Sequence, residues 1–175
     1  MQPFVFNTTK SIVFRPGASS ELSDLVGALL GDNVLFVTDP GLRKLGLCDP
    51  ALDSLTAAGR SVTVFDQVEA DPSRRTLEAA VNAGKAASVT AVVGFGGGSS
   101  LDVAKLAALL LGSGEDLDEA WGVSMAKGPR LPLVLVPTTA GTGSEVTPVS
   151  IITVGAEEKR GVSSPVILPD IAVLD

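Results

Sequence analysis

The sequence predicts an α/β fold, a Rossmann-like parallel β-sheet with helices on both of its faces. Two kinds of segment alternate along the 175 residues. Short, continuous runs of β-branched residues are typical of strands buried on both faces, and apolar residues at helical spacing are typical of amphipathic helices. Because strands and helices take turns, we expect βαβ units with right-handed crossovers. The length, without any linker, predicts one domain over 1–175.

The strands are predicted in chain order from their apolar runs. The amino-terminal segment predicts a small β-hairpin, with strands at 4–6 and 12–14 around turn residues 7–9. Buried strands are then expected at 34–37, 62–65, 89–93 and 133–136. Beyond residue 146 the pattern changes, and it predicts further strands near a sheet edge at 149–154 and 171–174, with a charged turn at 157–160 between them.

The spacing of apolar residues predicts three helices, which cover 22–29, 77–84 and 103–110. Ser73 stands where an N-cap should precede the second helix, and Ser99 or Ser100 can cap the third. The pairs Pro40-Gly41 and Asp71-Pro72 mark the points where strands end.

The composition excludes several classes of function. The chain has no histidine, which excludes Ser-His-Asp and Cys-His triads and most transition-metal sites. Its one cysteine, Cys48, cannot form an internal disulfide, so a reducing, cytoplasmic setting is expected. The formal charge of -7 without a basic stripe disfavours nucleic acid as a partner, and no apolar run is long enough for a membrane span or a signal peptide.

The glycine-rich segment 94–100 lies between a predicted strand and a predicted helix. Glycines allow the backbone to approach a ligand closely, and the free N–H groups at a helix amino terminus favour a phosphate. The segment contains no GxxxxGK[ST] loop, and it departs from GxGxxG because position 99 is serine. It therefore predicts an anion-binding cradle, although a tight turn without a ligand is the alternative.

Two acidic residues lie beside the predicted sheet edge. Asp39 ends a strand, where a carboxylate can accept hydrogen bonds from both hydroxyls of a ribose and repels a 2′-phosphate, so it favours NAD over NADP. The alternative is that Asp39 merely forms a turn with Pro40-Gly41. Asp102 is expected in the first turn of the helix after the glycines, with Lys105 three residues later. It either faces the cradle or makes a surface salt bridge.

Hydroxyl side chains are concentrated in the segment 137–145, Pro-Thr-Thr-Ala-Gly-Thr-Gly-Ser-Glu, which also follows a buried strand. These side chains suit a polar ligand, although they could instead form a capping network. Because the carboxyl ends of parallel strands share one sheet edge, we expect the three polar segments after the strands that end near Asp39, Phe95 and Pro137 to converge on one crevice. Lys159 either reaches the cofactor or belongs to the solvated charged turn. No carboxylate pair identifies acid–base catalysis, so no catalytic residue and no metal ligand is assigned.

These strings closely resemble the iron-containing (group III) alcohol dehydrogenases, whose relatives include the dehydroquinate synthases. The resemblance rests on Gly96-Gly97-Gly98-Ser99 with Asp102 and Lys105, on the specific Thr-Thr-Ala-Gly-Thr-Gly-Ser-Glu string at 138–145, and on Asp39, Asp71-Pro72, Lys159 and Pro169-Asp170. It spans nearly the whole chain. The fold it implies is the dehydroquinate synthase-like amino-terminal domain, and the activity it implies is nicotinamide-dependent interconversion of an alcohol and an aldehyde or ketone.

The resemblance also implies roles for single residues. Asp39 would hold the adenosine ribose, and Asp71, where the family often has asparagine, would border the adenosine pocket. Asp102 and Lys159 would lie closer to the nicotinamide. The pyrophosphate would lie on Gly96, Gly97, Gly98 and Ser99, and the adenine side and nearby phosphate on Thr138, Thr139 and Thr142.

One departure from the family is large. Members continue into a helical domain that supplies an aspartate and usually three histidines to Fe or Zn, and that helical metal-binding domain is absent before Asp175. The resemblance therefore implies that the chain holds NAD, with NADP less favoured, but lacks the reaction by itself. The expected partners are the nicotinamide dinucleotide, the missing helical domain and a second copy in a homodimer. A non-catalytic nucleotide-binding or self-associating fragment and a synthase relative remain as alternatives.

Overall fold

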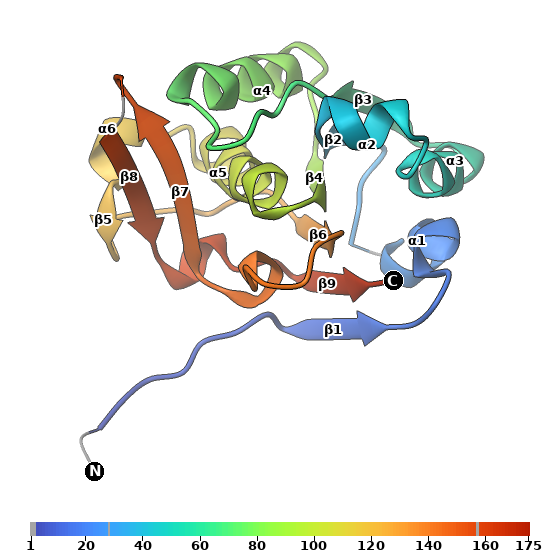
Figure 1. The fold of residues 1–175 in the computed structure, drawn as a ribbon, viewed down its shortest axis with the longest axis horizontal. Helices are drawn as coiled ribbons and strands as arrows, with labels where there is room; N and C mark the ends of the chain where they lie inside the picture. The colour runs from blue at the N-terminus through green and yellow to red at the C-terminus, as the bar shows by residue number, and fades with distance from the viewer. Residues whose placement is uncertain (1–2, 28, 157) are drawn as a thin grey trace.

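The computed structural model describes residues 3–27, 29–156 and 158–175, and Figure 1 shows its ribbon. A six-stranded sheet forms the centre, in the order β1-β9-β6-β4-β2-β3, and all of its pairs are parallel. Its strands are β1 (Ser11–Phe14), β2 (Asn33–Val37), β3 (Ser61–Phe65), β4 (Ala91–Gly96), β6 (Leu133–Pro137) and β9 (Ile171–Leu174). The predicted parallel α/β sheet is therefore confirmed.

Helices cover both faces of this sheet, because alternate residues of each buried strand point to opposite sides. They are α1 (Leu22–Val26), α2 (Pro40–Lys44), α3 (Asp49–Ala57), α4 (Arg74–Ala86), α5 (Gly98–Ser113) and α6 (Leu117–Ala120), with short 3-10 turns at Ala18–Glu21, Ser144–Val146 and Pro165–Ile167. On one face Val34, Phe36 and Val93 pack with residues of α1 and α3, and on the other Leu35 and Leu135 pack with residues of α4 and α5.

A second, three-stranded sheet packs against α5 and has the order β5-β8-β7. It consists of β5 (Gly122–Val123), β7 (Val149–Val154) and β8 (Glu158–Ser163), of which β7 and β8 form an antiparallel hairpin. Figure 1 shows α5 lying between β7 and the strands of the large sheet. Close contact with the large sheet depends on Gly94 in β4, because a Cβ there would lie 2.6 Å from the Cβ of Ala104 in α5.

The predicted amino-terminal hairpin is wrong. Residues 4–6 form no strand, and β1 pairs in parallel with β9 instead. The hydroxyls of Thr8 and Thr9 donate to the backbone oxygens of Val146 and Glu145, so residues 7–9 run along another loop and do not turn back. The strands predicted near a sheet edge are found there, because β9 lies next to the edge strand β1 and β7 is an edge strand of the second sheet.

Two local predictions also need correction, and three helices were not predicted. Residues 158–160 belong to β8, because the turn falls at 155–156, where Gly155 has a φ of 66°; position 157 lies outside the described residues. The first helix ends at Val26, short of the predicted 29, and position 28 lies outside the described residues. The helices α2, α3 and α6 were not predicted from the apolar spacing, because they are short or begin at proline-containing segments.

The capping predictions divide. Ser73 caps α4 as predicted, since its side chain accepts a hydrogen bond from the Thr76 amide. Neither Ser99 nor Ser100 caps α5, because the helix begins earlier, at Gly98, with Gly97 as its N-cap and without a side-chain cap. Among the described residues, no helix combines the length and apolar character that crossing a membrane requires.

Candidate functional site

The carboxyl ends of β2, β4 and β6 bring the three predicted polar segments together. These strands are neighbours in the sheet, and the Thr138 amide donates to the Gly96 carbonyl at 3.0 Å. A cleft of about 690 Å³, which we call the first cleft, opens over this edge. The residues that line it include Asp39, Leu42, Glu69, Gly97, Gly98, Ser99, Ser100, Thr138 and Thr139. The predicted convergence is thus confirmed as geometry.

The amino end of α5 forms the floor where an anion would lie. The first amides of a helix have no intrahelical acceptor, and no side chain caps them here. Gly96 has a φ of 147°, and a Cβ there would lie 2.8 Å from the Ser100 hydroxyl oxygen. A Cβ on Gly98 would lie 3.0 Å from Cγ2 of Thr142. The glycines therefore keep the backbone accessible between the two loops, as the cradle interpretation requires.

Asp39 performs a structural task as well as lining the first cleft. One of its carboxylate oxygens, Oδ1, accepts a hydrogen bond of 2.9 Å from the Leu42 amide and so caps α2. Pro40 occupies the first turn of that helix, where its missing N–H costs nothing. The predicted strand exit at Pro40-Gly41 is therefore a helix start, and the carboxylate is held in one position beside the cleft.

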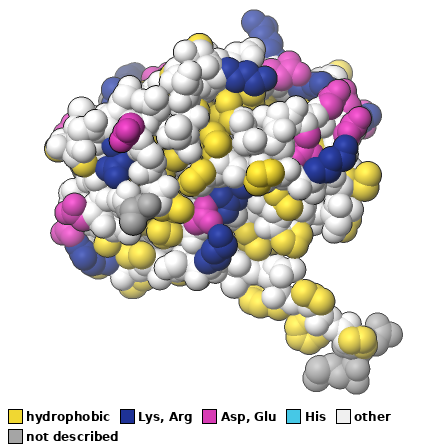
Figure 2. Space-filling view, turned by 180° about the vertical axis from the view of Figure 1, so that it is seen from behind, with side chains coloured by type: hydrophobic (Ala, Val, Ile, Leu, Met, Phe, Trp, Pro, Cys, Tyr) yellow, Lys and Arg dark blue, Asp and Glu magenta, His cyan; other side chains and the backbone are white. Residues whose placement is uncertain are grey.

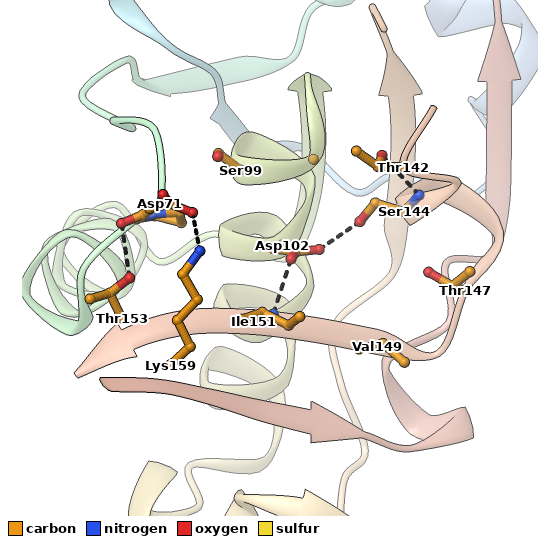
Figure 3. A pocket seen from close by; sticks show the side chains of 12 residues that line it. Asp71, Ser99, Asp102, Thr142, Ser144, Thr147, Val149, Ile151, Thr153 and Lys159 are labelled. Atoms are coloured by element: carbon orange, nitrogen blue, oxygen red, sulfur yellow. Dashed lines mark hydrogen bonds and ion pairs between the residues drawn. The ribbon is translucent and has the colours of Figure 1, made fainter. Parts of the chain in front are cut away.

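A second cleft of about 440 Å³ lies between α5 and β7. It meets the first cleft at Gly98 and Ser99, which line both, so the two form one path across the amino end of α5. Figure 3 shows the side chains that point into it. They include the predicted residues Asp71, Asp102, Thr142 and Lys159, together with Ser144, Thr147, Val149, Ile151 and Thr153.

Asp71 and Lys159 form an ion pair across the mouth of the second cleft, with 2.5 Å between Nζ and Oδ1 (Figure 3). Asp71 has a φ of 52°, a left-handed conformation that asparagine and aspartate adopt more readily than most residues. Its carbonyl accepts from the Thr153 hydroxyl at 3.2 Å. Lys159 projects from β8 and not from a solvated turn, so the paired strands direct it to this site.

Asp102 lies in the second turn of α5 and not in the first, because the helix already begins at Gly98. Its carboxylate accepts from the Ser144 hydroxyl at 2.6 Å and from the Ile151 amide at 3.0 Å. Burial raises its pKa above the ordinary value, against the opposing effects of Lys105 and these hydrogen bonds. The alternative of a surface salt bridge is wrong, because Lys105 is fully buried.

The ammonium group of Lys105 contacts backbone and hydroxyl oxygens more closely than it contacts Asp102. Its Nζ lies 2.9 Å from Ser144 Oγ and 2.8 Å from the Val149 carbonyl oxygen, but 3.7 Å from Asp102 Oδ1. Burial lowers the pKa of Lys105 to about 8, although the charges of Asp102 and Glu145 oppose the shift. The buried lysine therefore ties α5 to the hydroxyl-rich loop and to β7.

Two predicted residues lie in a different cleft from the one expected. Asp71 and Thr142 line the second cleft with Asp102 and Lys159, whereas Thr138 and Thr139 line the first. The chain crosses between the clefts within each loop: Glu69 and Ala70 line the first cleft immediately before Asp71. Adjacent positions in one loop can face different clefts, and the type of a residue does not reveal which cleft its side chain faces.

Among the cleft-lining residues that sequence reasoning did not assign to the site are Glu69, Ser144, Ile151 and Thr153. Ser144 could have been found, because it belongs to the hydroxyl-rich segment 137–145, whose composition predicts contacts with a polar ligand. Ile151 and Thr153 alternate along β7 and carry no polar signature of a site. Within the described residues, no group of three or more His, Cys, Asp or Glu side chains could hold a metal ion, and the donor set of this site does not fit a metal.

Comparisons with known proteins match almost the whole chain to one family. The family model described as iron-containing alcohol dehydrogenase matches residues 9–175. Sulfoacetaldehyde reductase from Bilophila wadsworthia is 37% identical over 173 residues, which cover 98% of this chain and 45% of that protein. The chain therefore spans about half the length of this relative.

Solved structures show the same relation. The crystal structure of a 1,3-propanediol oxidoreductase matches with a TM-score of 0.94 and 32% identity, over 99% of this chain and 46% of that one. The sulfoacetaldehyde reductase from Bifidobacterium kashiwanohense, solved in complex with NAD+, matches with a TM-score of 0.86 and 28% identity, over 100% of this chain and 46% of that one.

Proposed function

The chain belongs to the iron-containing alcohol dehydrogenase family, and we propose that it forms the NAD-binding part of an oxidoreductase that interconverts an alcohol and an aldehyde or ketone. The observation that carries the proposal is the continuous path made by the two clefts over the uncapped amino end of α5. An adenosine, a pyrophosphate and a nicotinamide joined in one molecule match a path of this kind.

The residues divide along this path. In the first cleft Asp39 holds the ribose hydroxyls of the adenosine, beside Thr138 and Thr139. At the meeting point Gly96, Gly97, Gly98 and Ser99 present amides to the pyrophosphate. In the second cleft Asp71, Asp102, Thr142 and Lys159 surround the nicotinamide end. The nicotinamide, when bound, supplies the hydride chemistry, and the protein supplies its position and its electrostatic surroundings.

We propose NAD rather than NADP as the cofactor, on the charge of the first cleft. Asp39 is held against this cleft by its hydrogen bond to Leu42. A carboxylate there accepts hydrogen bonds from ribose hydroxyls and repels a phosphate on the same ribose. The relative from Bifidobacterium kashiwanohense, solved with NAD+, supports this choice.

The family's description implies a metal, and the described residues of this chain do not fit one, since no cluster of metal-ligating side chains is found among them. We propose that the metal ligands come from polypeptide outside these 175 residues. A metal in such enzymes polarises the substrate oxygen. On this proposal the chain binds the cofactor by itself and completes the reaction only together with that polypeptide.

Titration of the chain with NADH, followed by nicotinamide fluorescence, tests the proposal. We expect saturable binding of NADH, and we expect added NAD+, which is not fluorescent, to displace it. No reduction of NAD+ is expected when alcohols are added to the chain alone. The absence of saturable binding at millimolar NADH would count against the cofactor site. Alcohol-dependent NADH formation by the chain alone would count against the proposal that the reaction requires metal ligands from polypeptide outside these 175 residues.

A second candidate is a fragment that associates with itself, and one feature favours it. Phe4, Val5, Phe6 and Phe14 are 77% to 84% exposed. Figure 2 shows the amino-terminal arm extending from the body of the protein with apolar side chains on its surface. Large exposed apolar surfaces tend to acquire partners. Light scattering at increasing concentration tests this candidate, and a strictly monomeric species would exclude it.

A further inference from the structure

Two carboxylates line the first cleft together, although they are 30 positions apart in the sequence. The strands β2 and β3 are neighbours, with Val37 opposite Phe65. The parallel pairing continues past the strand ends, because the Val68 amide donates to the Thr38 carbonyl at 3.4 Å. Asp39 and Glu69 each follow one of these two bonded residues, and both line the first cleft.

The Glu69 carboxylate is fixed in position by the start of α4. Its Oε1 accepts from the Ser73 amide at 2.9 Å, and the Thr76 hydroxyl lies within 2.8 Å of both oxygens. Burial raises the pKa of Glu69, but the hydrogen bonds from Thr76 and Ser73 outweigh it and hold the pKa below its ordinary value. Glu69 is therefore ionised at neutral pH and holds its charge at a defined place.

No positive side chain offsets these two charges within the cleft. The residues lining the first cleft, all of them within the described part of the chain, include Asp39 and Glu69 but no lysine or arginine. The second cleft, by contrast, holds Lys159, which pairs with Asp71. The side chains that line the first cleft therefore supply negative charge and no positive charge.

We propose that Glu69 is a second specificity-determining residue, which acts together with Asp39 to exclude cofactors that carry a phosphate on the adenosine ribose. The inference rests on the proposed function. Asp39 hydrogen-bonds the ribose, whereas Glu69 acts at a distance through its charge. The protein therefore keeps part of its discrimination when Asp39 alone is neutralised, and loses it when both residues are.

The test compares the dissociation constants of NADH and NADPH for the chain and for the variant Glu69→Gln. Glutamine keeps the length of the side chain and an oxygen that can accept from Ser73 and Thr76. We expect the ratio of the NADPH to the NADH dissociation constant to fall about threefold at low salt, because removing one negative charge weakens the repulsion of a phosphate on the ribose. At about 0.5 M salt the variant and the parent should converge, because the charges are screened.

A matched control is Glu78→Gln, which removes the same charge from the exposed face of α4, outside both clefts. Its ratio should stay at the parental value. A second variant, Asp39→Asn, should keep a discrimination that still weakens with salt, and the double variant should lose that dependence. The inference is overturned if Glu69→Gln changes both cofactors equally, or if Asp39→Asn alone abolishes the salt dependence.

Failure of the proposed function is recognised separately. If the parent chain binds neither NADH nor NADPH, the cofactor site itself is wrong and this inference falls with it. If the parent binds NADH normally and only the Glu69→Gln ratio stays unchanged, the cofactor site stands and the role of Glu69 alone is refuted.

Discussion

The ammonium group of Lys105, fully buried in α5, donates a hydrogen bond of 2.9 Å to the hydroxyl of Ser144. That hydroxyl in turn donates to Asp102 at 2.6 Å, so one buried cation and one carboxylate share a single serine. The arrangement joins α5, whose amino end is the candidate anion cradle, to the loop that carries the threonines, and both Asp102 and Ser144 line the second cleft.

The pH dependence of stability should reveal this buried lysine. Burial lowers the pKa of Lys105 from 10.5 to about 8. Between these values the unfolded chain binds a proton that the folded chain does not, so the free energy of unfolding rises with pH. Relative to Lys105→Met, the parent should gain stability from pH 8 upward, by at most about 3 kcal/mol.

Urea unfolding of both proteins at about pH 7.5 and about pH 9.5 measures this gain. The comparison between the two proteins cancels the titration of all other groups. A difference in unfolding free energy that stays constant over this range would mean that the ammonium group is not desolvated as the structure indicates.

Filling the cradle should weaken cofactor binding strongly without unfolding the protein. The variant Gly98→Val places a side chain beside Thr142, where even a Cβ would lie 3.0 Å from Cγ2. We expect NADH affinity to fall at least about tenfold, the loss that one charge-assisted hydrogen bond implies. Ala57→Val, on the exposed side of α3, adds similar bulk away from both clefts and should bind NADH as the parent does. Equal affinity of the two variants would exclude the α5 amino end as the phosphate site.

Two substitutions at Asp39 separate its capping role from its role in binding. Asp39→Ala removes the cap on the Leu42 amide and should lower the unfolding free energy by about 1 kcal/mol. Asp39→Asn keeps a capping oxygen and should be nearly as stable as the parent. Both should bind NADH more weakly, because neither offers a carboxylate to the ribose. Normal NADH affinity in Asp39→Asn would mean that the Asp39 carboxylate caps α2 but does not bind the cofactor.

Removing the charge of Lys159 should affect binding more than stability. Its ion pair with Asp71 is exposed on both sides, and such pairs contribute at most about 1 kcal/mol. Lys159→Met should therefore unfold close to the parental midpoint but bind NADH several-fold more weakly at low salt. Lys85→Met, which removes an exposed charge from α4 outside both clefts, is the control. Indistinguishable affinities would make Lys159 a surface residue only.

The buried centre of the fold was predictable because burial leaves a direct mark on composition. The runs at 34–37 and 133–136 are apolar throughout, and both became central strands of the sheet. The amino-terminal hairpin failed because the partner of β1 is β9, about 160 positions away. Local alternation of apolar residues cannot distinguish a neighbour in sequence from a distant one.

The candidate site was predictable where backbone chemistry demands a particular residue. Gly96 and Gly98 are needed for close approach, and Asp39 follows a strand, so all three could be identified from the sequence. Ile151 and Thr153 were missed because a residue that faces a cleft from a strand resembles one that faces solvent. Glu69 was missed because its proposed role depends on sharing the first cleft with Asp39, which the sequence does not show.

The sequence by itself determined the class of fold, the edge of the sheet that carries the site and the family to which the chain is similar, because apolar runs and glycine-rich loops encode burial and close approach locally. Only the tertiary structure decided that Lys105 is buried, that Lys159 forms an ion pair with Asp71, and that Asp39 and Glu69 line the same cleft. Each of these depends on pairing between distant segments. The effect of a charged residue depends on its spatial neighbours, which its position in the sequence does not specify.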